Sequence, residues 1–334
     1  MSAKAEHTTP QQSPLLRVRD LSVNYEISGG GFFANRRVLT ALEGINFDLG
    51  PGETIGLVGE SGSGKTTLGR AILRQVNAAS GTISFDGQDI TRTKGRSLRR
   101  LRKGMQVILQ DPYASLNPRM RVADIVAEPL QVHGIVRSRE DAMQSVLELL
   151  DRVGLPADSA QRYPHAFSGG QRQRIGIARA LALKPKLIVA DEPVSALDVS
   201  VRAQVVNLMR KLQRDIQLSY VFIAHDLSII RHISHRVAIL YAGQMVEYAD
   251  KKALFKKPYH PYTEALLSAV PVPNPSAQKR RRRIVCDGEL PDLLHPPAGC
   301  RFRTRCPLAS ERCSKEAPPF EQKAPGHWAA CWNR

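Results

Sequence analysis

Apolar runs and amphipathic stretches alternate along most of the chain. The runs TIGLVG (54–59), LIVAD (187–191) and YVFIAH (220–225) are short and bounded by turn residues, as in strands that are covered on both faces. Each precedes a stretch with helical periodicity, which reads LGRAILRQV, VRAQVVNLMRKLQRDIQ or LSIIRHIS. Strands that alternate with helices in this way predict an α/β fold with a mostly parallel sheet, covered on both faces.

The same patterns divide the chain into regions. Residues 1–14 are polar and are predicted to be a disordered leader, whereas short β-like runs begin at residue 15. Residues 112–165 have helical periodicity, most clearly in EDAMQSVLELLDRVGL, and predict an inserted helical subdomain. Toward the C-terminal end the composition becomes rich in proline, basic residues and cysteine. We therefore expect a main domain over 15–250 and an accessory region over 251–334.

The bulk properties favour a cytosolic protein with anionic partners. The polar N-terminus predicts no signal peptide, and the longest apolar runs are too short to span a bilayer. The 334 residues carry a net charge of +17, which favours nucleotides, nucleic acid or the negative inner face of a membrane. Much of this charge lies in RTKGRSLRRLRK (92–103) and KRRRR (279–283). A solvated basic face or a linker is the preferred explanation of both runs, because neither contains interleaved aromatic residues.

A phosphate-binding loop is predicted at GESGSGKTT (59–67), because this pattern lies between a predicted strand and a predicted helix. Its glycines leave room for phosphates and allow successive backbone N–H groups to point at the oxyanions. Lys65 is placed to reach the β and γ phosphates, and the Thr66 hydroxyl to bind Mg²⁺. The predicted ATP-binding residues of the loop are Gly59, Glu60, Ser61, Gly62, Ser63, Gly64, Lys65, Thr66 and Thr67.

LIVADE (187–192) supplies the carboxylates that this chemistry needs. Asp191 ends a predicted buried strand and is a candidate ligand of Mg²⁺. Glu192 is the candidate general base that polarises the attacking water. His225 follows a neighbouring predicted strand, where its imidazole would orient that water and sense the γ-phosphate.

FSGGQRQRI (167–175) precedes LIVADE by eleven residues, and this pair of motifs resembles that of the ATP-binding cassette (ABC) ATPases. The resemblance covers about residues 15–250. It implies a P-loop ABC ATPase fold with a RecA-like core, an antiparallel β subdomain and the inserted helical subdomain. It also implies that Tyr25 stacks on adenine, and that Gln110 touches both Mg²⁺ and a transmembrane partner.

The same resemblance implies a catalytic site shared between two subunits. A signature segment would cap the γ-phosphate of the ATP held by the opposite subunit, and a second loop would couple the two sites. The matching residues are Ser168, Gly169, Gly170 and Gln171 for the signature, and Ser195, Ala196, Leu197 and Asp198 for the coupling loop. Two cassettes would close around two ATP molecules, hydrolyse them and reopen. Gln110, Glu192 and His225 would have catalytic roles in this hydrolysis. The opening and closing of the two cassettes would be passed on to two membrane-spanning permease subunits.

Other segments resemble those of oligopeptide and dipeptide importer ATPases, so the likeness extends over nearly the whole chain. They are QDPYASLNPRM (110–120), DEPVSALDVSVRAQ (191–204), KPYHPYTEALLSAVP (257–271) and GELPDLLHPPAGCRFRTRCPLASERC (288–313). This resemblance implies peptide uptake, a position on the cytoplasmic face of the inner membrane and an extracytoplasmic solute-binding protein. The subfamily also includes importers of nickel and other small solutes. The exact solute, and whether the cassette pairs with itself or with a related ATPase, stay open.

Four cysteines in the tail, Cys300, Cys306, Cys313 and Cys331, are separated by five, six and seventeen residues. Four thiolates that meet at one point would suit an iron–sulfur cluster or zinc, although no CxxC pair is present. Related peptide importers carry a [4Fe-4S] cluster at such a tail, so the resemblance implies one here. Structural free thiols are the alternative, and Cys286 is expected to be a bystander.

Two other functions are alternatives to peptide import. A soluble ABC ATPase that acts on nucleic acid or ribosomes would account for the basic charge, but members of that type have two cassettes or long coiled coils, which this chain lacks. No nucleic-acid partner is therefore expected. An exporter ATPase is disfavoured by the HPYT segment and by the lack of a fused membrane domain.

Overall fold

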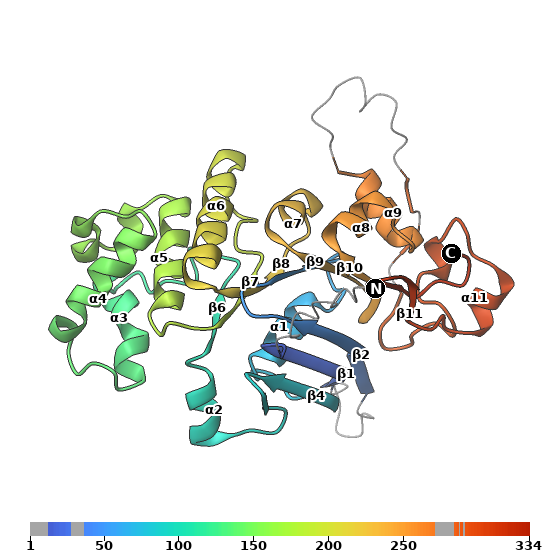
Figure 1. Cartoon of the computed structure of the whole chain (residues 1–334), viewed down its shortest axis with the longest axis horizontal. Helices are drawn as coiled ribbons and strands as arrows, with labels where there is room; N and C mark the ends of the chain where they lie inside the picture. The colour runs from blue at the N-terminus through green and yellow to red at the C-terminus, as the bar shows by residue number, and fades with distance from the viewer. Residues whose placement is uncertain (1–12, 28–36, 271–283, 287, 290) are drawn as a thin grey trace, which may run out of the picture.

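A computed structural model describes residues 13–27, 37–270, 284–286, 288–289 and 291–334, and shows two sheets flanked by helices (Figure 1). Most of the predicted leader and the basic run 279–283 lie outside these residues. The strands are β1 (Leu16–Ile27), β2 (Arg37–Leu49), β3 (Thr54–Val58), β4 (Ser80–Phe85), β5 (Gln88–Asp89), β6 (Met105–Ile108), β7 (Leu187–Asp191), β8 (Ser219–Ile223), β9 (Arg236–Tyr241), β10 (Gln244–Asp250), β11 (Glu321–Ala324) and β12 (His327–Ala329). The α-helices are α1 (Lys65–Ile72), α2 (Gly95–Leu101), α3 (Val122–Val132), α4 (Arg139–Arg152), α5 (Gly169–Leu181), α6 (Val199–Ile216), α7 (Leu227–Ile233), α8 (Lys251–Lys256), α9 (Pro261–Ser268) and α11 (Glu311–Lys315). Three short 3₁₀ helices are η1 (Ala157–Gln161), η2 (Pro164–Ala166) and η3 (Arg303–Arg305).

The main sheet has the strand order β11-β12-β10-β9-β3-β8-β7-β6. The five strands β9, β3, β8, β7 and β6 run parallel to one another. The other three, β10, β12 and β11, extend the sheet from β9 by antiparallel pairing. The predicted mostly parallel sheet is thus confirmed in its centre. Because parallel strands end at the same edge, the segments that follow β3, β7 and β8 meet there.

A second sheet of four strands, in the order β2-β1-β4-β5, is antiparallel. Its apolar side chains share a core with α1 and with one face of the main sheet, as Leu21, Ile45, Leu68 and Val189 do. This sheet corresponds to the antiparallel β subdomain implied by the family resemblance. The packing brings the end of β1, with Tyr25, near the segment that links β3 to α1.

Helices α3, α4 and α5 lie at the opposite end of the molecule from the C-terminal tail (Figure 1). Helix α4 begins at a capping box in which the Ser138 hydroxyl accepts a hydrogen bond from the Asp141 N–H, and the Asp141 carboxylate accepts one from the Ser138 N–H. Such reciprocal caps satisfy N–H groups that a helix start leaves unpaired. Val126, Val146 and Ile177 are fully buried and belong to one apolar cluster with residues of the main sheet such as Ile188. A separate helical subdomain over 112–165 therefore stays a prediction.

The tail continues the main sheet, because β12 pairs with β10. The fully buried carboxylate of Glu247 on β10 accepts hydrogen bonds from the backbone N–H groups of Tyr259 (2.7 Å) and His260 (3.0 Å). It also binds Nε2 of His327 on β12 at 2.6 Å. One side chain therefore joins the start of α9 to the tail strand. A division of the chain near residue 250 remains a proposal.

Among the described residues, every helix falls short of the length and apolar character needed to cross a membrane. The basic run 92–103 includes α2, which has no buried residue. This matches the expectation of a solvated basic face.

Candidate nucleotide site

The loop between β3 and α1 has a backbone that only glycine permits at two positions. A Cβ atom on Gly59 would lie 2.2 Å from the Leu240 carbonyl oxygen and 2.5 Å from Ser63 Oγ, far inside contact distance. Gly64 has φ +101° and serves as the N-cap of α1, a conformation that L side chains rarely adopt. The loop therefore ends at the positive end of a helix dipole, as predicted for a phosphate site.

Lys65 and Thr66 lie at the start of this helix. The Lys65 ammonium is buried and donates to the carbonyl oxygens of Gly59 (2.8 Å) and Glu60 (2.7 Å). Burial lowers the pKa of Lys65, although the charges of Glu192, Asp191 and Glu60 act in the opposite direction. The Thr66 hydroxyl donates to Asp191 Oδ1 at 3.1 Å, so the two predicted Mg²⁺ ligands are adjacent. Burial raises the pKa of Asp191.

Glu192 has an unusual backbone conformation with φ +47°. For a residue with a side chain this costs on the order of 1–3 kcal/mol, and such residues gather at functional sites. The Glu192 carboxylate accepts a hydrogen bond from Gln110 Nε2 at 2.9 Å and lies 3.5 Å from His225 Nδ1. The structure thus brings together the three residues that the sequence predicts to be catalytic.

A pocket of about 600 Å³ lies between the loop and these side chains, which is within the usual range for small-molecule sites. Tyr25 lines it from β1, opposite the residues at the carboxyl edge of the main sheet. The predicted residues that line the pocket are Tyr25, Ser61, Gly62, Gly64, Lys65, Thr66, Thr67, Gln110, Glu192 and His225. Leu39, Ala41 and Leu293 line it as well. Sequence reasoning missed these three because an isolated apolar residue carries no signal of its own.

The predicted signature residues do not line this pocket. Ser168 is the N-cap of α5, where its hydroxyl accepts from the Gln171 N–H and the Gln171 side chain accepts from the Ser168 N–H. The predicted coupling loop also lies outside the pocket, and its Ser195 hydroxyl donates to the Glu192 carbonyl oxygen at 3.0 Å. Within one chain the signature is therefore separate from the phosphate loop.

The pocket fits ATP with Mg²⁺. A Cβ atom on Gly62, which lines the pocket, would meet no heavy atom within 4 Å, so the loop leaves open space there. Thr66, Asp191 and Gln110 offer a hydroxyl, a carboxylate and an amide, and Mg²⁺ in such sites takes one or two protein ligands together with phosphates and water.

The tail cysteines lie near one another but give no metal site in this arrangement. Burial raises the pKa of the Cys306 thiol to about 11, and the charges of Cys300, Cys331 and Cys313 add to this rise. Among the described residues, which include all four predicted ligands, no group of three or more His, Cys, Asp or Glu side chains is placed to hold a metal ion. None of the five cysteines forms a disulfide. The iron–sulfur prediction is therefore not supported by this structure.

Comparison with known proteins agrees with this architecture. Residues 42–195 match the family model described as ABC transporter, and residues 246–313 match the one described as Oligopeptide/dipeptide transporter, C-terminal region. Two solved structures share the fold. The dimeric ATP-binding cassette MJ0796 bound to ADP and Pi has a TM-score of 0.62 and 27% identity, over 71% of this chain and 98% of that chain. The cbiO1 protein from Clostridium perfringens has a TM-score of 0.63 and 24% identity, over 74% of this chain and 92% of that chain.

The phosphate loop, the carboxylates at the end of β7 and these matches define an ATP-hydrolysing cassette, and the chain belongs to the ABC transporter family. Its relatives include the oligopeptide transport ATP-binding protein AppF of Bacillus subtilis, 50% identical over 97% of this chain and 98% of that protein. The oligopeptide transport ATP-binding protein OppF of Salmonella typhimurium is 48% identical over 93% of this chain and 94% of that protein. A putative peptide import ATP-binding protein of Brucella ovis is 48% identical over 96% and 98%.

Replacing Glu192 with Gln tests the predicted base. The amide keeps the shape and the contact with Gln110 but cannot accept a proton, so ATP should still bind while kcat falls by about 10²-fold or more. Phosphate release and binding of a fluorescent ATP analogue measure the two effects separately.

Two variants serve as comparisons for this experiment. Lys65→Ala removes a charged donor from the loop, and should weaken binding itself by about 10-fold or more. Glu148→Gln makes the same chemical change on the exposed face of α4 and should alter neither quantity. Normal turnover by Glu192→Gln would show that Glu192 is not the base.

Proposed function

We propose that the chain is the ATP-hydrolysing subunit of a membrane ABC importer that takes up di- or oligopeptides. The observation that carries the proposal is the presence in one chain of two features. One is the pocket that joins the phosphate loop to Glu192 and His225. The other is a tail that matches the oligopeptide/dipeptide transporter region. Relatives named for oligopeptide transport or peptide import are similar over nearly the whole length, tail included.

The geometry supports a different role for each of these residues in ATP hydrolysis. The loop N–H groups and Lys65 bind the phosphates. The Thr66 hydroxyl and the Asp191 carboxylate would hold Mg²⁺, which would supply charge neutralisation of the phosphates. Glu192 accepts the proton of the attacking water, and His225, 3.5 Å from its carboxylate, orients that water. Gln110 binds the Glu192 carboxylate, so the segment that follows β6 senses the state of the site.

A second cassette completes the site. Because Ser168 and the α5 N-terminus lie outside the pocket of their own chain, their positive helix end is available to a γ-phosphate held by another subunit. The dimeric structures of a related cassette support this arrangement. A homodimer and a pair with a related ATPase both satisfy this geometry.

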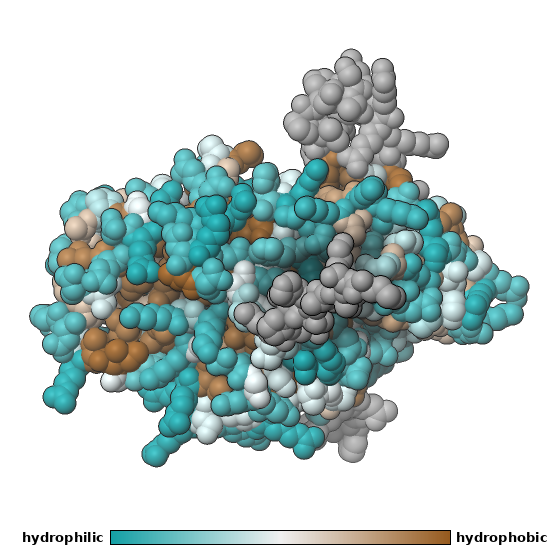
Figure 2. Space-filling model, in the orientation of Figure 1, coloured by the Kyte–Doolittle hydropathy of each residue, from teal (hydrophilic) through white to brown (hydrophobic). Residues whose placement is uncertain are grey.

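The surface of the helical region supports contact with permease subunits. Large apolar side chains are exposed there, and Figure 2 shows apolar patches on the side of α3, α4 and α5. The exposed large apolar residues in this region and in the segment before it are Leu109, Tyr113, Val132, Ile135 and Tyr163. Exposed apolar patches are typical of protein contacts. The proposed location is therefore the cytoplasmic face of the inner membrane, with two permeases and an extracytoplasmic solute-binding protein as further partners.

Peptide uptake in cells that lack the chain tests the cargo. Plasmid-borne wild-type protein should restore uptake of a labelled peptide, whereas Glu192→Gln should not, because import requires hydrolysis. Labelled nickel is measured in parallel. If the wild-type protein restores uptake of nickel but not of the peptide, the cargo is a metal ion and not a peptide. Exclusive recovery of the protein with ribosomes or DNA would overturn the import function.

A finer proposal keeps the [4Fe-4S] cluster on Cys300, Cys306, Cys313 and Cys331, on the strength of their four-thiol chemistry alone. Protein purified without oxygen should then contain iron and absorb visible light. Cys306→Ser should remove both signals, whereas the matched change Cys286→Ser should preserve them. A colourless, iron-free and folded wild-type protein would contradict the cluster.

A further inference from the structure

The tail holds the phosphate loop at Glu60. The Arg305 guanidinium binds both carboxylate oxygens of Glu60, with Nη1–Oε2 at 2.8 Å and Nη2–Oε1 at 3.1 Å. The backbone N–H of Glu60 donates to the Tyr262 hydroxyl at 2.9 Å. Paired parallel hydrogen bonds of this kind fix geometry as well as charge. Glu60, which follows β3, is thus bound by Tyr262 of α9 and by Arg305, which lies 245 positions away in the sequence.

Aromatic side chains pack closely beside these contacts of Glu60. Phe302, which is fully buried, lies edge-on to Tyr241 with 5.1 Å between ring centroids, and Tyr262 lies 4.7 Å from Tyr241. These rings join β9, α9 and the tail directly beside the loop. The Arg305 side chain is only 10% exposed, and its other hydrogen-bond acceptors are the Cys286 carbonyl oxygen and the Tyr241 hydroxyl.

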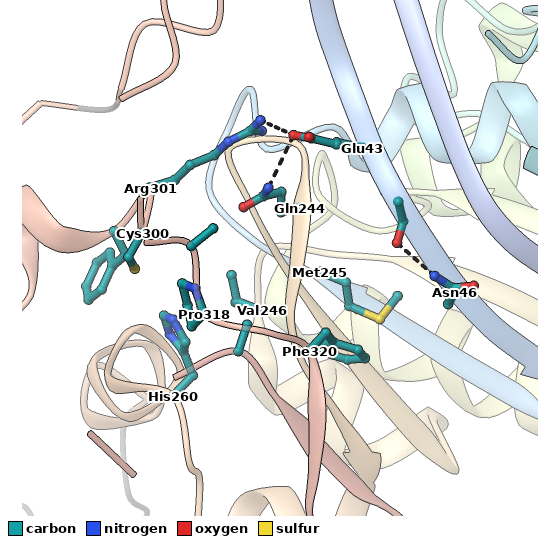
Figure 3. A pocket seen from close by; sticks show the side chains of 14 residues that line it. Glu43, Asn46, Gln244, Met245, Val246, His260, Cys300, Arg301, Pro318 and Phe320 are labelled. Carbon is teal, nitrogen blue, oxygen red and sulfur yellow. Dashed lines mark hydrogen bonds and ion pairs between the residues drawn. The ribbon is translucent and has the colours of Figure 1, made fainter. Parts of the chain in front are cut away.

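A second connection runs through the turn between β9 and β10. Buried Arg301 donates to the Ala242 carbonyl oxygen and pairs with Glu43, and Figure 3 shows its side chain reaching Glu43 beside Gln244. The next residue of the turn, Gly243, donates from its N–H to the Ser63 carbonyl oxygen at 3.0 Å. The tail therefore contacts the phosphate loop directly at Glu60 and indirectly at Ser63.

Because Glu60 is charged, its contact with Arg305 bears on the affinity of the loop for ATP. A carboxylate in a loop that receives a polyphosphate opposes binding unless it is neutralised. Glu60 belongs to the centre of the loop, since its backbone carbonyl oxygen accepts a hydrogen bond from the Lys65 ammonium at 2.7 Å. Arg305 offsets that charge, and its own pKa is raised, chiefly by the hydrogen bond with Glu60. Another tail residue, Leu293, lines the nucleotide pocket itself.

We propose that Arg305 is a positioning residue of the ATP site: it neutralises Glu60 and holds the phosphate loop in the conformation that binds ATP. The C-terminal tail therefore contributes to nucleotide binding. The inference rests on the phosphate loop as the place where ATP binds, and is independent of the cargo.

Nucleotide affinity of the full-length chain tests this proposal. Arg305→Ala should weaken ATP binding about tenfold, or about 1.4 kcal/mol, and should weaken ADP less and AMP least, because the uncovered Glu60 charge repels each phosphate. Adding Glu60→Gln to Arg305→Ala should restore most of the lost affinity, since the uncompensated carboxylate is then gone. Arg305→Lys, which keeps the charge without the paired hydrogen bonds, should give an intermediate value.

Arg334→Ala is the matched control. Arg334 pairs with Glu264 on α9 at the same distance of 2.8 Å, so its loss removes a bond between the tail and α9 without touching the loop, and ATP affinity should stay unchanged. An Arg305→Ala chain that binds ATP as the wild type does, or one that Glu60→Gln fails to rescue, would overturn the proposal. If Arg305→Ala does not fold, Arg305→Lys with and without Glu60→Gln decides in the same way. Failure of the wild-type chain to bind ATP would instead refute the nucleotide site itself.

Discussion

The backbone shape of the phosphate loop is the constraint on which the rest of the structure depends. A helix start leaves N–H groups without partners, and a loop can turn them toward phosphate only if its backbone enters conformations closed to most residues. Gly59 lies against the Leu240 carbonyl oxygen and Gly64 has a positive φ, so strand β9 and the loop must be built together. The parallel sheet serves this geometry by placing the Mg²⁺ ligands and Glu192 at the same edge.

Much of this site could be predicted from the sequence, because its residues come from local motifs. The strand before Gly59 and the helix after it follow from apolar periodicity, and the loop pattern lies between them. Asp191 is a strand end in the structure, as predicted. Parallel pairing then explains why Glu192 and His225 meet although 32 residues separate them. The strained φ of Glu192 had no sequence signal, since nothing in the motif reports backbone angles.

The tail could not be predicted in the same way. Its composition indicates a separate accessory region, yet β12 extends the main sheet and Glu247 joins β10 to α9 and to His327. Arg305 is one basic residue among many, and only packing brings it to Glu60. Contacts between segments so distant along the chain depend on the whole fold. For the same reason, the [4Fe-4S] cluster that the family resemblance implies depends on how the fold places four distant thiols, and their arrangement in the described residues does not support it.

The central claim is that the phosphate loop and the C-terminal tail act as one ATP-binding unit. Hydrogen–deuterium exchange of the full-length protein, measured with and without Mg-ATP, tests it most directly. The account predicts that ATP slows exchange both in the loop peptide 59–67 and in the tail peptide around Arg305, with no change in α4. Protection of the loop without any change around Arg305 would contradict the claim.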